Sequence, residues 1–134
     1  MRGITAGLLA ALMALAAPEQ GEAQEEERLA LPSGLEAYLQ EVIVGQAAMG
    51  LTLRLRFVAG AFSGQEEFAT QTADLEYLCN EYALKEIDMK GETPDRVVIS
   101  LADRASVFGQ FDPTVTQIFE SFSVADATCI LEMF

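Results

Sequence analysis

Two cysteines, Cys79 and Cys129, place the strongest constraint on how this chain can fold. A small, even number of cysteines in an exported chain is typical of a structural disulfide, so we expect these two to be joined. In the loop-entropy treatment, a bridge that closes about 50 residues stabilises a fold by about 4 kcal/mol. That is a large share of the ~5–15 kcal/mol by which a domain is stable. The chain has no CxxC pair, which argues against a thiol-exchange enzyme.

The first residues are typical of a secretory signal peptide. Arg2 is followed by an uncharged run, residues 4–17, and then by Pro18. This run is shorter than the roughly 20 residues that a membrane-spanning helix needs. Small residues at positions 21 and 23 favour cleavage after Ala23, and residues 14–16 offer an earlier site. An N-terminal core or amphipathic helix is the alternative. We expect a signal peptide over 1–23, no membrane span, and a periplasmic or secreted product.

The rest of the chain is long enough for one domain. The acidic cluster in residues 24–30 predicts a disordered tail, which leaves a single domain over 31–134. Loss of Arg2, Glu19 and Glu22 with the leader leaves 19 acidic and 7 basic side chains. This charge repels phosphate backbones and anionic lipids, so we do not expect nucleic-acid binding. The acidity suits solubility or attraction to a basic protein partner.

Several catalytic and metal-binding classes are excluded by residue type. The chain has no histidine, so histidine-based triads and the usual zinc and copper ligand sets cannot form within it. The acids of the 88–95 loop lack the calcium-loop spacing. We therefore expect no metal, no cofactor and no catalytic residues, although a carboxylate-dependent hydrolase stays open.

Alternating apolar residues predict the first two strands. Residues 35–44 suit one strand, and residues 51–59 alternate strictly between apolar and other side chains, as a half-buried strand does. Residues 45–50 would form the hairpin loop between them. Symmetric pairing about that loop would place Glu41 opposite Arg54 and Leu39 opposite Arg56. Arg54 and Arg56 share one strand face, where they could bind an anion or neutralise neighbouring acids.

The best helix signal runs from Asp74 to Ala83 after a polar loop over 61–71, with Thr72 as its N-cap and Asp74 in its first turn. One face carries the apolar residues and would point Cys79 into the core, namely Leu75, Leu78, Cys79 and Tyr82. Tyr77 and Leu84 lie nearly opposite this face. They could form an interaction surface, although scattered exposed apolar residues are normal.

The last third predicts further strands. Residues 96–102 form a strand, Asp103 and Arg104 a turn, and residues 105–111 a returning strand. The Asp103–Arg104 turn could be a recognition point, or simply a favourable turn sequence. A helical turn at 113–117 and two strands would follow, the last one carrying Cys129. The fold class is therefore α+β, with one main helix packed on an antiparallel sheet of about five or six strands.

Aromatic residues gather late in the chain. Their default place is the core, but several exposed together would form a protein-binding patch. They are Phe108, Phe111, Phe119, Phe122 and Phe134.

Three blocks of the sequence resemble a family of short exported bacterial proteins known only as a domain of unknown function. They are Asp-Leu-Glu-Tyr-Leu-Cys-Asn-Glu-Tyr-Ala at 74–83, Ile-Ser-Leu-Ala-Asp-Arg at 99–104, and Cys-Ile-Leu-Glu-Met-Phe at 129–134. The resemblance implies a bacterial, exported protein without a known activity, and it transfers no site residues.

The function that these observations favour is a small exported, non-catalytic protein, either a protein-binding protein or an accessory subunit of the bacterial envelope. The partner is unknown. The alternatives are a carboxylate-dependent hydrolase and a small-ligand carrier with a pocket between helix and sheet.

Overall fold

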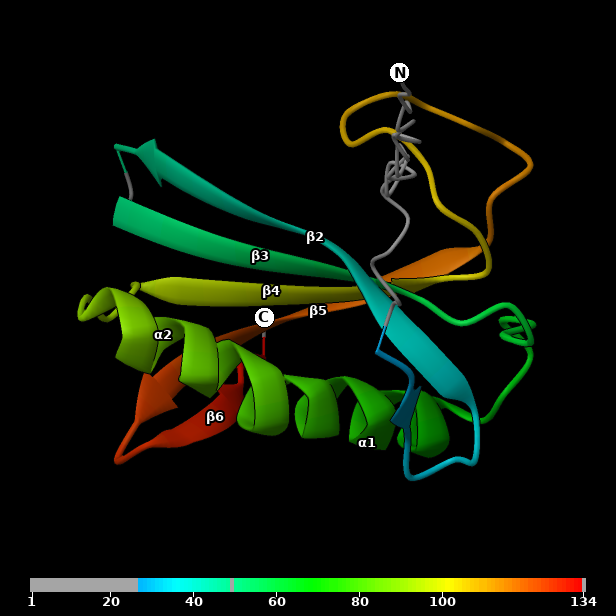
Figure 1. Cartoon of the computed structure of the whole chain (residues 1–134), viewed down its shortest axis with the longest axis horizontal. Coiled ribbons are helices and arrows are strands. Elements are labelled where there is room, and N and C mark those ends of the chain that lie inside the picture. The colour runs from blue at the N-terminus through cyan, green and yellow to red at the C-terminus, as the bar shows by residue number, and fades with distance from the viewer. Residues whose placement is uncertain (1–26, 49, 134) are drawn as a thin grey trace, which may run out of the picture.

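The computed structural model describes residues 27–48 and 50–133, which form a six-stranded sheet and one interrupted helix (Figure 1). The predicted signal peptide and residues 24–26 of the predicted tail lie outside the described residues. In chain order the elements are β1 (Leu29–Ala30), β2 (Glu36–Ala47), β3 (Gly50–Val58), α1 (Phe68–Leu78), the π-helical turn η2 (Cys79–Ala83), α2 (Leu84–Lys90), β4 (Arg96–Ala102), β5 (Gln117–Ala125) and β6 (Thr128–Leu131).

The sheet is mixed, which corrects the prediction of an antiparallel one. Its strand order is β1 to β6 in sequence, and β3 and β4 pair in parallel while every other neighbouring pair is antiparallel. The parallel pair follows from the connection, because the chain leaves β3, crosses over as the helix and re-enters β4 in the same direction. The number of strands, the helix and the disulfide are as predicted.

The predicted β2–β3 register is wrong. Glu41 lies opposite Arg56, Ile43 lies opposite Arg54, and Leu39 lies opposite Phe57. An irregularity between Leu39 and Glu41 shifts the register there, and an extra residue in one strand produces such a shift. The two strands also continue into the predicted loop, since β2 runs to Ala47 and β3 begins at Gly50.

Gly50 is required where β3 begins. Its φ is +108°, a region that other residues rarely adopt, and a Cβ there would overlap the carboxylate of Asp95. Asp95 Oδ2 accepts a hydrogen bond of 2.7 Å from the backbone N–H of Leu51. The start of β3 is thereby joined to the loop that leads into β4.

Nine described residues, 27–35, precede β2, and two of them form the strand β1. Leu29 pairs with Ala37 as part of β1 and is only 6% exposed. The prediction of a disordered tail is therefore wrong for residues 29–30. The physical reason is that Leu29 and the nearby Leu31 bury their side chains in the core.

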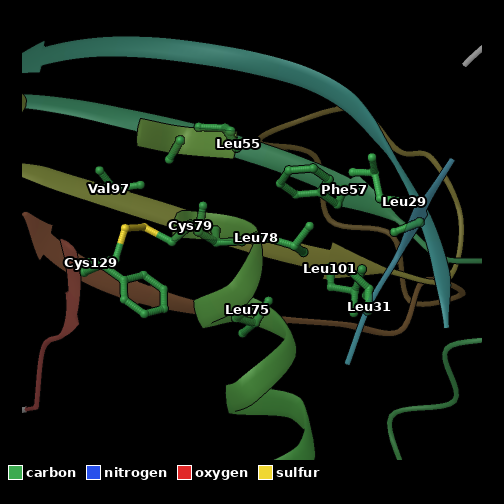
Figure 2. Packing of buried hydrophobic residues seen from close by; sticks show 14 of the residues in the cluster. Leu29, Leu31, Leu55, Phe57, Leu75, Leu78, Cys79, Val97, Leu101 and Cys129 are labelled. Atoms are coloured by element: carbon green, nitrogen blue, oxygen red, sulfur yellow. A yellow bond between two sulfur atoms is a disulfide. The ribbon is translucent and has the colours of Figure 1, made fainter. Parts of the chain in front are cut away.

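The core lies between the helix and one face of the sheet (Figure 2). The alternation predicted for β3 is confirmed, because Leu53, Leu55 and Phe57 are buried in the same cluster as helix residues Leu75 and Leu78. The rings of Tyr82 and Phe57 also pack in a T-shaped arrangement, with centroids 6.1 Å apart. Burial of Tyr82 raises the pKa of its hydroxyl group above the ordinary value.

The helix begins earlier than its apolar pattern indicates. It starts at Phe68, so Thr72 is not its N-cap and Asp74 does not lie in its first turn. The first turn is largely exposed, with Phe68 and Ala69 on the surface, so it adds nothing to the apolar face on which the prediction was based. Asp74 is buried instead, and its Oδ1 accepts a 3.0 Å hydrogen bond from the backbone N–H of Ser33.

The π-turn η2 changes which side chains face the core. A turn of π-helix contains about one residue more than a turn of α-helix, so the residues that follow are rotated by roughly 100° about the helix axis relative to a regular α-helix. Ala83 is consequently fully buried, and Leu84 and Ile87 pack against the core cluster. Tyr77 packs partly against it as well. The prediction that Tyr77 and Leu84 lie opposite the core face is therefore wrong.

After β4 the chain forms a long loop, residues 103–116, rather than the predicted strand at 105–111 and helical turn at 113–117. The two predicted C-terminal strands are confirmed as β5 and β6. Asp126 and Ala127, both with positive φ, make the turn between them. No helix in the described part of the chain is long and apolar enough to span a membrane.

Candidate functional site

The face of the sheet that points away from the helix carries the two arginines of β3. Because Leu53 and Leu55 point toward the core, Arg54 and Arg56 point to the opposite face. The pairing of β3 with β4 places Val98 beside Arg54 and Ser100 beside Arg56. The predicted placement of both arginines on one strand face is confirmed.

Arg56 fastens the 103–116 loop over this face. Its side chain is almost fully buried, and its guanidinium group forms an ion pair with Glu41. The same group donates hydrogen bonds to the backbone oxygen of Ser106 (3.1 Å) and to its Oγ (3.0 Å). Gln40 Nε2 donates a third hydrogen bond, of 2.8 Å, to the Ser106 backbone oxygen.

Asp103 closes the base of the loop. Its backbone N–H donates to the backbone oxygen of Thr116, and its Oδ1 accepts from the Thr116 N–H, both at 3.0 Å. Arg104 lies beside Asp103, with Nη2 and Oδ2 3.5 Å apart, and is exposed. The two residues predicted as a recognition turn therefore lie at the foot of the loop. The geometry assigns Asp103 a role in holding it closed.

The tip of the loop is ordered by its own side chains. Asp112 Oδ1 accepts hydrogen bonds from the Thr114 hydroxyl (2.7 Å) and backbone N–H (3.0 Å). These bonds, together with the charge of Arg104, lower the pKa of the Asp112 carboxyl group. Such aspartate-centred turns stabilise a loop without regular secondary structure.

Phe108 covers both arginines. The guanidinium carbon of Arg54 lies 5.2 Å from the centroid of the Phe108 ring, and that of Arg56 lies 5.5 Å from it. Both distances are within the range of cation–π attraction. This ring is the only interaction of the Arg54 guanidinium within the described residues, whereas Arg56 is also paired with Glu41.

A hollow of about 310 Å³ lies between the loop and the sheet. No carboxylate lines it among the described residues, so it has a local excess of positive charge in an acidic protein. Its lining includes Arg54, Val98, Ser100, Phe111, Gln117 and Phe119.

The rim of the hollow is aromatic and exposed. Phe111 is 90% exposed and Phe119 is 65% exposed, while Phe108 and Val107 are also exposed. Phe122 is fully buried. The default prediction of a core position is thus right for Phe122 and wrong for Phe108, Phe111 and Phe119. Phe134 lies outside the described residues.

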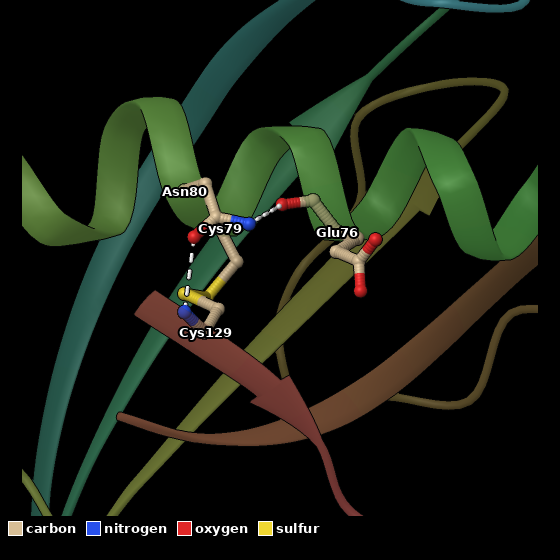
Figure 3. The surroundings of a disulfide bond; sticks show 4 residues. All are labelled: Glu76, Cys79, Asn80 and Cys129. Atoms are coloured by element: carbon tan, nitrogen blue, oxygen red, sulfur yellow. Dashed lines mark hydrogen bonds between the residues drawn. A yellow bond between two sulfur atoms is a disulfide. The ribbon is translucent and has the colours of Figure 1, made fainter. Parts of the chain in front are cut away.

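The opposite side of the sheet holds the disulfide rather than a reactive site. Cys79 and Cys129 are joined, as predicted, with their Cα atoms 6.1 Å apart (Figure 3). Asn80 Oδ1 accepts a 2.9 Å hydrogen bond from the Cys129 backbone N–H, while Asn80 Nδ2 donates to the backbone oxygen of Glu76. Within the described residues, no group of three or more acidic or cysteine side chains could hold a metal ion.

Of the predicted site residues, the structure brings together Arg54 and Arg56, with Asp103 and Arg104 at the foot of the adjoining loop. Tyr77 and Leu84 lie on the helix, away from this group.

Sequence reasoning did not identify the roles of Ser106, Phe108 and Asn80. An asparagine inside a strong helix pattern is a usable signal, because asparagine disfavours helix interiors and favours side-chain to backbone bonds. Nothing local identifies Ser106, whose partners Gln40 and Arg56 lie on β2 and β3.

No curated protein and no solved structure matches this chain. The resemblance to a family known only as a domain of unknown function is confirmed by a match over residues 10–134, and the chain belongs to Family of unknown function (DUF6497).

Proposed function

We propose that this protein is a small exported, non-catalytic binding protein, which acts as a partner or accessory subunit of another protein of the cell envelope. The observation that carries the proposal is the group of exposed rings, Phe108, Phe111 and Phe119, around the hollow under the 103–116 loop. Aromatic residues are enriched at the energetic centres of protein interfaces. We name these three residues the aromatic rim.

Charge favours a partner of a different sequence over a second copy. The full chain carries a formal net charge of −13, so two copies would repel each other. A neutral or basic partner would meet no such barrier, and a basic one would be attracted. An exported location is consistent with the disulfide, because disulfides persist in oxidising compartments.

The rim is held in place before any partner arrives. Arg56 and Gln40 fasten the loop at Ser106, and Asp103 closes its base. A preorganised surface loses less conformational entropy on binding than a mobile one. The loop is therefore suited to presenting Phe108 and Phe111 in a fixed geometry.

The test is site-specific photo-crosslinking in the native host. A photoreactive phenylalanine analogue would replace Phe111, Phe119 or, as the control, Met89, which is also exposed but lies on α2. We expect one crosslinked product of the same mass from positions 111 and 119, and none from 89. Equal products from all three positions, or a product with the mass of a dimer of this chain, would overturn the proposal.

A small-ligand carrier is the second candidate, because the hollow is near the lower limit of volumes that hold small molecules. Its position on the open face differs from the expected pocket between helix and sheet. A carrier predicts that the thermal unfolding midpoint rises with an apolar anion even when the Phe111→Ser change is present. The hollow does not support the alternative of a carboxylate-dependent hydrolase, because no acidic side chain lines it among the described residues.

A further inference from the structure

We infer that the hollow beneath the 103–116 loop binds the free carboxylate end of the partner polypeptide, with an apolar last side chain against the rim. This inference rests on the proposed function, since it names the part of the partner that the site would hold. Four features of the hollow support it. Within the described residues, Arg54 has no ion pair and no acid lines the hollow; polar groups lie beside Arg54, and exposed rings surround the opening.

Arg54 is the group that would receive the carboxylate. Its guanidinium has no ion pair and no hydrogen bond among the described residues, and Phe108 covers one face of it. A guanidinium has five N–H donors arranged to fit a planar carboxylate, and ring contact leaves its edge free to donate them. Arg56 cannot serve in the same way, because Glu41 and Ser106 already occupy it.

The charge distribution favours a ligand with a single negative charge over a polyanion. Among the described residues of the hollow, one guanidinium, that of Arg54, has no ion pair, while the chain as a whole is strongly acidic. A phosphate-rich ligand would be repelled at long range and would find one matching cation at short range. A chain end carries one carboxylate, which one arginine can pair.

The rest of the lining suits the end of a polypeptide. Ser100 and Gln117 offer hydrogen-bonding groups to a backbone, and Val98, Phe111 and Phe119 offer apolar contact to a last side chain. The hollow is open at the surface beside the aromatic rim, so the preceding residues of a partner could continue across the rim. Capture of a chain-terminal carboxylate is a recurring mode of peptide recognition.

The experiment compares two forms of one probe by nuclear magnetic resonance titration of the full-length mature protein. The probe is an N-acetylated tetrapeptide, Gly-Ser-Gly-Phe, either with a free carboxylate or with a terminal amide. We expect the free acid to shift the signals of the Arg54 side chain and of the Val98, Ser100 and Phe119 amides. The amide should bind about tenfold more weakly, as expected for loss of a charge-assisted bond.

Arginine variants then test whether Arg54 causes the difference in affinity between the acid and the amide. In Arg54→Gln the acid and the amide should bind alike, and Arg54→Lys, which keeps the charge, should retain part of the difference. Arg28→Gln removes the same charge outside the hollow and should leave the tenfold difference intact. Equal binding of acid and amide to the unaltered protein would overturn the inference.

Two further outcomes separate this inference from the proposed function. If crosslinking at positions 111 and 119 succeeds but the acid and amide peptides bind alike, the binding surface stands and the carboxylate assignment is wrong. If N-acetylphenylalanine binds as tightly as the tetrapeptide, the site holds a small anion, which overturns the assignment to a polypeptide end.

Discussion

Asn80 and Cys129 are joined by a 2.9 Å hydrogen bond from the Cys129 backbone N–H to Asn80 Oδ1, directly beside the disulfide that ties Cys79 to Cys129. The helix therefore holds β6 by one covalent bond and one hydrogen bond from adjacent residues (Figure 3). β6 is a short strand at the edge of the sheet, and β5 is its only strand neighbour within the described residues. Removal of the disulfide and removal of the hydrogen bond should therefore have different, separately measurable effects.

Removal of the disulfide should destabilise the fold strongly. The double change Cys79→Ala with Cys129→Ala should lower the free energy of unfolding by about 2–4 kcal/mol, because the unfolded chain regains the entropy of a loop of 50 residues. Urea denaturation of both proteins under oxidising conditions measures the difference. A loss below about 0.5 kcal/mol would contradict a stabilising role for the bridge.

Asn80→Ala should lower the free energy of unfolding by about 1–2 kcal/mol, because it leaves the partly buried N–H of Cys129 without its acceptor. The better helix propensity of alanine offsets only part of that loss. Hydrogen exchange at the Cys129 amide should accelerate in parallel. Glu81→Ala, an exposed position in the same π-turn, is the matched control and should leave that amide protected. Unchanged exchange in Asn80→Ala would show that the side chain does not hold β6.

The apolar periodicities of the strands and the helix predicted much of the fold, because each periodicity shows which side of that one element is buried. The alternation from Leu51 to Ala59 identified the core face of β3, and the apolar face around Leu75 and Leu78 identified the helix. The parallel pairing of β3 with β4 could not be read in the same way. A period of two residues states which side of a strand is buried, and it does not state which strand lies next to it.

The candidate site was only partly predictable, for a related reason. Residues 105–111 follow a turn and contain residue types that are common in strands, yet Val107 and Phe111 are exposed on a loop. The groups that hold this loop, on Gln40 and Arg56, are distant in sequence from Ser106. Only the register of the sheet, altered by the irregularity after Leu39, brings them together.

Arg56→Gln should release the 103–116 loop from the sheet. It removes the ion pair to Glu41 and the hydrogen bonds to Ser106. We expect a stability loss of about 1–2 kcal/mol, below the usual cost of breaking a buried pair because Glu41 is partly exposed. Chymotrypsin should then cleave faster after Phe108 or Phe111. Arg104→Gln is the charge-matched control, and equal cleavage of the two variants would contradict the fastening role.

The lowered pKa of Glu66 predicts that the stability of the fold decreases in acidic solution. Desolvation is the largest single influence on the pKa of Glu66 and raises it, but the hydrogen bonds, chiefly those from the backbone N–H groups of Ser63 and Gly64, together outweigh it and lower the pKa below its ordinary value. A carboxyl group with a lowered folded-state pKa stabilises the fold above its ordinary pKa, and that contribution is lost as pH falls through the lowered value. The unfolding midpoint of Glu66→Gln should therefore lie below that of the unaltered protein at pH 7. The gap should close in more acidic solution, and a gap that stays constant from pH 7 to pH 2 would rule out this linkage.

Leu84 distinguishes a structural role from an interaction role on the helix. Because η2 rotates the following residues toward the core, Leu84→Ala should lower the free energy of unfolding by about 1–2 kcal/mol, a reduced cavity cost for a half-buried leucine. Met89→Ala, at an exposed position of the same segment α2, should change stability by less than about 0.5 kcal/mol. Crosslinking from position 111 should be unaffected by Leu84→Ala at temperatures where the variant is folded. Loss of that crosslink without loss of stability would instead place the partner surface on the helix.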